Sequence, residues 1–476
     1  MTLMTMTKIP SSLFRCSRSA ARFSAEKLES IKGPFSGFSL FKFLAALFII
    51  AGIISPLRAK ADDRVYINID SPIMRQFPIA IPDFRSADGS RGDSSPRLPS
   101  AEILSNDLSM TGYFKVLDPR TFVEKSGSTG MNASDISFRD WSFVGAELLV
   151  KGTYEVRGGD LVVEARLYDV FKGSQVLGKR YTGDVKDHRR IIHHLANDIM
   201  EALTGRKGFF DAKIAFVSAR RGNKEIYVTD FDGSEVRQLT DLNSISLSVR
   251  WAPDGRRIAY ASYASGQPCI YIQDTSSGAK RKLATRASLN ISPAWSPDGN
   301  SLAVSMNLDG SPNIFLIDTN GGVLKRLTDN RGIDVSPCFS PDGHKITFVS
   351  NRSGGPQVYV MDADGSNQHR KTFSGDYNTA PSWSPKGDRI AYTGKSSHGF
   401  NIFSVTPEGS GVTQLTTGRG DNQEPAWSPD GSMIAFSSSR AGAAQIYMMR
   451  ATGDNPMQVT TSPGEQSAPN WSPAGK

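Results

Sequence analysis

The chain has 476 residues and a formal net charge of +8. This length exceeds what one ordinary hydrophobic core holds, so two domains are expected. Residues 1–61 alone carry a net charge of +7, which leaves the rest of the chain close to neutral. Because nucleic-acid binding needs a basic footprint on the folded domain, the sequence argues against that class of function.

The first 61 residues have the features of a secretory signal. Residues 43–54 are an unbroken apolar run of 12 residues, preceded by Lys42. The run is shorter than the roughly 20 residues that a membrane-spanning helix needs. Ala59 and Ala61 then supply the small residues that signal peptidase reads. We predict that residues 1–61 are a cleaved signal peptide, with no membrane insertion afterwards; an uncleaved anchor is the alternative.

Residues 62–205 do not repeat and predict a small α/β domain with a mixed sheet. Residues 65–69 and 79–81 alternate like strands, and residues 147–154 and 161–169 read as a hairpin. Ser100 is the predicted N-cap of a helix that ends at Gly112. A second helix is expected from Asp187 to Gly205.

A repeat of 44 residues fills the rest of the chain. The sequence motif Trp251-Ala252-Pro253-Asp254-Gly255, which we also call the repeated phrase, recurs with small changes at Trp295, Phe339, Trp383, Trp427 and Trp471. Each repeat holds four short β-branched or aromatic runs separated by turn residues. Four strands in about 44 residues is the length of a propeller blade. The sequence therefore predicts a six-bladed β-propeller over residues 209–476.

The first and last copies of the repeat are incomplete in complementary ways. The first lacks the tryptophan phrase, and the last, at residues 469–475, is that phrase alone. We predict that the C-terminal strand completes the first blade beside residues 214–218. Such a clasp closes the ring and leaves no free sheet edge.

The repeated aspartates and tryptophans have structural interpretations. Aspartate before glycine is what a tight turn needs, and Lys386 and Ala474 replace it in two copies, which suits a turn better than a carboxylate site. The tryptophans are expected to pack between adjacent blades.

A polar residue opens the innermost strand of every repeat. We call this set the polar ring: Ser246, Asn290, Asp334, Asn378, Asn422 and Gln466. Two roles are open and compatible. The side chains could cap backbone groups at the strand starts, or they could form a docking surface at one mouth of the central channel.

Nucleophilic and metal chemistry find little support in the sequence. It contains no Gly-x-Ser-x-Gly elbow, and its six histidines are scattered. Cys269 and Cys338 fall at different repeat positions, so we expect no disulfide between them and no cofactor.

The signal, the α/β domain, the junction 203–209 and six blades of the Trp-Ser-Pro-Asp-Gly type together resemble the TolB family of the Tol-Pal system. The resemblance covers residues 62–476. It implies a monomeric, non-catalytic periplasmic scaffold whose propeller binds a Pal-type peptidoglycan-associated lipoprotein. It also implies support of outer-membrane integrity and invagination during cell division.

The resemblance further implies that the first strand after the signal is a mobile segment that contacts a TolA-type inner-membrane protein. The matching residues here are Arg64, Val65, Tyr66, Ile67, Asn68, Ile69 and Asp70. The polar ring is the candidate lipoprotein face, on geometry and not on a matched motif. The alternatives are a periplasmic propeller enzyme with acids in its channel, and a propeller that binds calcium or a small ligand.

Overall fold

The computed structural model describes residues 75–87, 98–122, 130–283, 287–418 and 420–475. The predicted signal peptide and the predicted mobile segment, residues 64–70, lie outside these residues. The α/β domain and the propeller belong to one compact unit.

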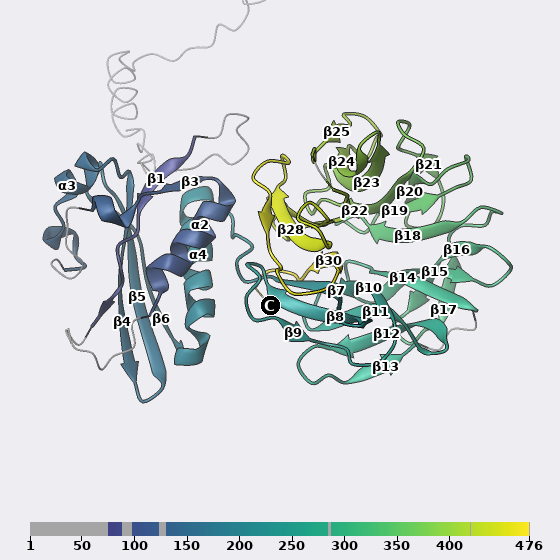
Figure 1. Ribbon diagram of the computed structural model, residues 1–476, viewed down its shortest axis with the longest axis horizontal. Helices are drawn as coiled ribbons and strands as arrows, with labels where there is room; N and C mark the ends of the chain where they lie inside the picture. The colour runs from purple at the N-terminus through teal and green to yellow at the C-terminus, as the bar shows by residue number, and fades with distance from the viewer. Residues whose placement is uncertain (1–74, 88–97, 123–129, 284–286, 419, 476) are drawn as a thin grey trace, which may run out of the picture. The chain divides into compact units, whose positions relative to one another are not determined.

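The first domain is an α/β domain with a mixed sheet, as predicted (Figure 1). The sheet order is β3-β1-β4-β5-β6, with β2 paired to β4; β1 is parallel to β3 and β4, and the pairs β4–β5 and β5–β6 are antiparallel. Its strands are β1 (Phe77–Ala80), β2 (Arg85–Ser86), β3 (Phe114–Val116), β4 (Leu148–Arg157), β5 (Asp160–Asp169) and β6 (Ser174–Asp184). Its helices are α2 (Ser100–Thr111), α3 (Phe138–Phe143) and α4 (His188–Thr204), with 3₁₀ turns at Pro119–Thr121, Ala133–Asp135 and Val185–Asp187.

The two long helices end as predicted, but one of them begins differently. Gly112 and Gly205 both have φ +72°, the left-handed conformation that ends a helix most easily at glycine. Ser100, however, is the first residue of α2 and not its N-cap, which is Pro99. Its buried hydroxyl instead lies 2.8 Å from Nε2 of His188 at the start of α4. The side chain that was expected to cap one helix therefore joins two.

The propeller has six four-stranded antiparallel sheets (Figure 1). Blade 1 is β30 (Gln466–Trp471), β7 (Lys213–Arg221), β8 (Asn223–Asp230) and β9 (Arg237–Gln238). Blade 2 is β10 (Ser246–Trp251), β11 (Arg257–Ser265), β12 (Gln267–Asp274) and β13 (Lys280–Lys282). Blade 3 is β14 (Leu289–Trp295), β15 (Ser301–Asn307), β16 (Pro312–Asp318) and β17 (Val323–Arg326). Blade 4 is β18 (Asp334–Phe339), β19 (Lys345–Ser350), β20 (Gln357–Asp362) and β21 (His369–Arg370). Blade 5 is β22 (Asn378–Trp383), β23 (Ile390–Ser396), β24 (Gly399–Val405) and β25 (Thr413–Gln414). Blade 6 is β26 (Asn422–Trp427), β27 (Met433–Ser438), β28 (Gln445–Arg450) and β29 (Met457–Gln458).

The C-terminal strand β30 pairs with β7, in the arrangement that the repeat count predicts (Figure 1). Trp471 is opposite Ile214 and Gln466 is opposite Ser218. The indole of Trp471 also meets Phe209 edge-on, with ring centroids 5.6 Å apart. Residues from the two ends of the repeat array thus share one buried cluster.

The repeated phrase has the structural roles expected of it. In blade 2, Oδ1 of Asp254 accepts hydrogen bonds from the backbone N–H groups of Arg256 and Arg257, at 2.8 and 3.0 Å. Between blades, the indole N–H groups of Trp295 and Trp427 donate to the carbonyl oxygens of Arg250 and Ser382 in the preceding blades. Cys269 and Cys338 are both free thiols.

Candidate functional site: the two ends of the propeller channel

The polar ring lies at the starts of the six innermost strands, and all of its side chains are buried. Their exposed fractions are between 0 and 2%. Nδ2 of Asn378 donates to Oε1 of Gln357 and to the carbonyl of Ser374, both at 2.9 Å. Oδ1 of Asn422 accepts from the Ser438 hydroxyl and the Arg440 guanidinium, at 2.8 and 2.9 Å. The ring therefore holds loops and strands together, and whether it also contacts a partner stays a prediction.

The residue that precedes each ring position is the accessible one. Ile245, Ile333 and Tyr377 are 44, 46 and 40% exposed, Leu289 is half-buried, and Asp421 and Glu465 are exposed. We call these six residues the mouth surface. Its side chains change from apolar in blades 2–5 to acidic in the other two. Period-2 alternation along a strand predicts this exposure, but we predicted a contact role only for the polar position.

The mouth surface has a regular backbone. The carbonyls of Ile245, Tyr377 and Asp421 accept from the N–H groups of Tyr263, Lys395 and Ser439, at 2.9–3.0 Å. Because these hydrogen bonds fix the backbone, the exposed side chains are presented on a rigid rim.

Each innermost strand has a β-bulge at the same point. The strand pairing shifts register there in every blade. The bulged residues all have positive φ, which is uncommon for residues other than glycine: Ser248 (56°), Ser292 (53°), Ser336 (55°), Ala380 (48°), Glu424 (56°) and Ala468 (50°). All six line the channel cavity.

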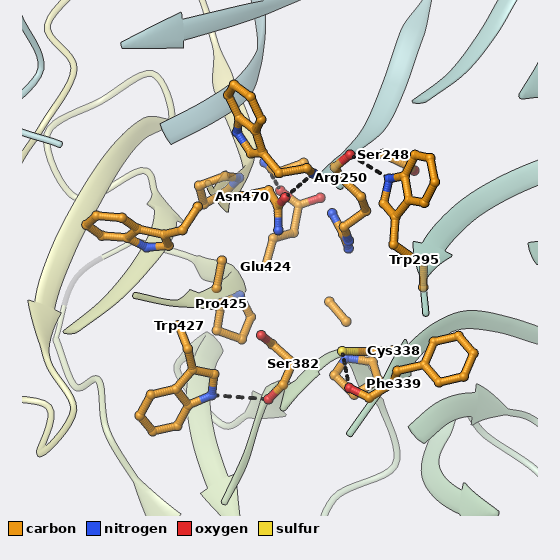
Figure 2. Close-up of a pocket in the computed structure, with 18 of the residues that line it drawn as sticks. Ser248, Arg250, Trp295, Cys338, Phe339, Ser382, Glu424, Pro425, Trp427 and Asn470 are labelled. Atoms are coloured by element: carbon orange, nitrogen blue, oxygen red, sulfur yellow. Dashed lines mark hydrogen bonds between the residues drawn. The ribbon is translucent and has the colours of Figure 1, made fainter. Parts of the chain in front are cut away.

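The channel cavity has a volume of about 380 Å³ and lies toward the far ends of the innermost strands. It is lined by the bulged residues, by the residues two positions further on, and by the tryptophans and prolines of the repeated phrase (Figure 2). No polar-ring residue is among those that line it. The ring therefore lies at the strand starts, and the cavity begins two residues further on and extends toward the strand ends.

The cavity lining is poor in catalytic groups. Within the part of the chain that the structure describes, only Arg250 and Glu424 are charged among the lining residues. Burial raises the pKa of the Cys338 thiol, so it stays protonated and is not a ready nucleophile. The channel-enzyme alternative predicted a cluster of acids, and the described lining offers one carboxyl group.

A largely buried polar cluster connects the α/β domain to blade 1. Nδ1 of His193 in α4 lies 2.7 Å from Oδ2 of Asp107 in α2, and Nε2 of His193 lies 3.8 Å from Oδ2 of Asp232 in the β8–β9 turn. These three side chains are at most 4% exposed. Arg189 donates to the same Asp232 oxygen, with Nε at 3.1 Å. We call these four residues the interdomain cluster.

The three oxygen and nitrogen atoms of this cluster are close enough together to hold a metal ion. However, the Arg189 guanidinium already supplies Asp232 with a positive partner, and the Ser234 hydroxyl donates to the other oxygen at 2.6 Å. Burial opposes the charge of Asp232, but the hydrogen bonds from Ser234 and Arg189 outweigh it and lower its pKa. At Asp107 burial dominates and raises the pKa. These contacts favour a structural role for the cluster.

Among the described residues, no helix is long and apolar enough to cross a membrane.

Comparison with known families matches both domains. The model of the TolB beta propeller domain matches residues 200–475. The chain belongs to the TolB family. The model of the TolB amino-terminal domain matches residues 65–176, so both predicted domains occur in the expected order.

Individual relatives agree with this assignment. "Tol-Pal system protein TolB" from Desulfosudis oleivorans is 41% identical over 191 residues, which cover 40% of this chain and 44% of that protein. The protein of the same name from Syntrophus aciditrophicus is 41% identical over 199 residues, with the same coverage. In both cases the match spans less than half of the relative's length. The crystal structure of TolB from Acinetobacter baumannii has a TM-score of 0.73 at 27% identity, covering 84% of this chain and 97% of that one.

Proposed function

We propose that this protein is a non-catalytic, monomeric scaffold of a Tol-Pal system in the periplasm. In this proposal the propeller binds a Pal-type lipoprotein, the N-terminal segment binds a TolA-type protein, and the assembly supports outer-membrane integrity and invagination at division. The observation that carries it is the match of both domains, in order, to the TolB family. The named relatives supply the link to the Tol-Pal system.

We place the lipoprotein at the mouth surface, with the polar ring beneath it. Exposed apolar side chains on a rigid rim are typical of the centre of a protein interface, and the acidic sector offers a polar edge. Because the ring residues are buried, they would act by fixing the strand starts, or would contact a partner only where a side chain reaches between the rim residues.

Replacing Ile333 and Tyr377 together by arginine is expected to weaken lipoprotein binding by about 100-fold or more. Two apolar contacts near the centre of the proposed interface are lost, and truncating a hot-spot residue costs about 2 kcal/mol or more. The measurement is isothermal titration calorimetry with the purified Pal-type lipoprotein encoded in the same genome. Val412→Arg, at an exposed site in blade 5, is the matched control and should bind like wild type.

One result of that titration and one further variant would change the proposal. Unchanged affinity in the double variant would move the lipoprotein away from the mouth surface. Asn378→Ala tests the ring itself: a loss of affinity larger than its loss of stability would support direct contact, and a loss in stability alone would leave only the supporting role.

Deleting residues 62–70 is expected to abolish binding of the TolA-type protein and to change lipoprotein affinity. A segment that either packs on its own domain or adds to a partner's sheet links the two equilibria, provided that the lipoprotein prefers one state. The measurement is calorimetry with each purified partner, against a control in which the nine residues are scrambled. If the wild type, the deletion and the scrambled variant all bind a given partner with the same affinity, and this holds for both partners, the switch is contradicted.

A further inference from the structure

The channel cavity contains two opposite charges on a lining that is otherwise uncharged. Glu424 occupies the bulge position of β26 in blade 6, where the other five blades have serine or alanine. Arg250 occupies the second lining position of β10 in blade 2, where the equivalent residues are Ala294, Cys338, Ser382, Ala426 and Asn470. Blade 1 lies between these two blades, so the charges face the cavity from either side of β30.

Neither charge is fully compensated by the described protein groups. Oε2 of Glu424 accepts one hydrogen bond, from the backbone N–H of Ala468 at 2.6 Å. One amino group of Arg250 donates to the carbonyl of Val249 at 2.8 Å. Among the described residues, neither side chain has a further hydrogen-bond or ion-pair partner, although the positive charges of Arg250 and Lys224 act on Glu424 at longer range. Figure 2 shows both in the cavity, with Asn470 beside them.

Burying the two charges is unfavourable, and this shifts the pKa of both groups. Burial raises the pKa of Glu424 and lowers the pKa of Arg250, with each charge offsetting the other only in part. A fold that needed only a bulge would place serine or alanine here, as the other blades do. The positive φ of Glu424 is shared by the bulge residues of the other five blades, so it is the charged side chain and not the backbone that distinguishes blade 6.

The size and rim of the cavity suit a small polar molecule. Its volume of about 380 Å³ lies at the lower end of the range of ligand sites. Trp251, Trp295, Trp427 and Trp471 and neighbouring prolines form apolar walls around the two charges. Such walls limit access of water and strengthen the interaction of a bound charge with its partner.

We propose that the channel cavity binds a small zwitterion of the amino-acid class, with its carboxylate on Arg250 and its ammonium group on Glu424. Guanidinium and carboxylate geometries match in paired hydrogen bonds, and the ammonium group offers three donors to a carboxylate. The Nδ2 group of Asn470 and the hydroxyl of Ser382 offer further polar contacts, while Oδ1 of Asn470 accepts a hydrogen bond from the backbone N–H of Trp251 at 2.7 Å. This binding goes beyond the scaffold function and does not depend on it, because no residue of the mouth surface or of the polar ring lines the cavity.

The first test changes the ligand and leaves the protein intact. Calorimetry with the purified full protein would compare glycine, L-alanine, D-alanine and L-serine with acetate, methylammonium and acetamide. At least one amino acid is expected to bind saturably, and the analogues that lack either charge are expected to bind at least about 30-fold more weakly. If no amino acid binds at millimolar concentrations, or if acetate binds as tightly as glycine, the proposal is wrong.

The second test changes the site. Arg250→Gln and Glu424→Gln are each expected to weaken binding of the best amino acid by at least about 30-fold. Lys325→Gln and Glu408→Gln remove exposed charges from blades 3 and 5 and should bind like wild type. Thermal melting shows whether each variant is folded. Wild-type affinity in both glutamine variants would overturn the assignment, and their failure to fold would leave the ligand comparison to decide it.

Discussion

Removing residues 466–476 is expected to lower the free energy of unfolding by more than about 5 kcal/mol, enough to prevent stable closure of the ring. The deletion takes away β30, which is the pairing partner of β7, and with it the buried indole of Trp471. Loss of one buried tryptophan side chain alone costs about 3–5 kcal/mol, and the unpaired edge of β7 adds to this. Domains of ordinary stability have only about 5–15 kcal/mol in total.

Urea unfolding followed by circular dichroism measures this effect, with gel filtration to detect association through the free edge of β7. The control removes only residues 474–476, which follow the last strand, and should unfold like wild type. Trp471→Ala should fall between the two. A truncated chain that unfolds at the wild-type urea concentration would mean that the ring is held closed without β30.

The blade count and the ring closure could be predicted because they follow from local signals that repeat. Every blade carries the same turn phrase at a step of 44 residues, and a turn is set by a few neighbouring residues. The register of the missing strand then follows from which copy lacks the phrase. The helix ends at Gly112 and Gly205 were also predictable, since glycine adopts positive φ without strain.

Other features could not be predicted because they depend on residues far apart in the chain. Strand β6 has mostly exposed residues with little alternation, so its sequence resembles a loop, and it is fixed by pairing with β5. Ser100 has the sequence context of an N-cap, but its hydroxyl forms a hydrogen bond with His188, which is 88 positions away. The polar ring illustrates a third case: the sequence placed it at the strand starts but could not give its burial.

The charged residues of the cavity and of the interdomain cluster also could not be predicted as sites from the sequence, because they come from distant parts of the chain. At the repeat position of Glu424, the other five blades have serine or alanine. The sequence does not show that this position faces the channel, because that depends on the bulge. Asp107, His193 and Asp232 come from three elements, and no spacing in the sequence relates them.

Replacing Asp232 by asparagine is expected to lower the free energy of unfolding by about 2–4 kcal/mol. Breaking a buried pair typically costs 3–5 kcal/mol because it leaves the remaining charge without a partner. Here Asp232 is buried but Arg189 is 37% exposed, and water offsets part of the loss. The measurement is urea unfolding at neutral pH, together with limited proteolysis at the exposed junction residues Arg206 and Lys207.

Asp230→Asn is the matched control for this prediction. Asp230 is two residues away and pairs with Lys213, which is half-exposed, so its loss should cost no more than about 1 kcal/mol. The double variant Arg189→Gln with Asp232→Asn should cost less than the sum of the two single changes, because the two groups share one interaction. If the costs add, or if Asp232→Asn is as stable as its control, Asp232 does not hold the α/β domain to blade 1. If they do not add and proteolysis at the junction becomes faster, the pair of Arg189 and Asp232 is a contact that holds helix α4 to blade 1.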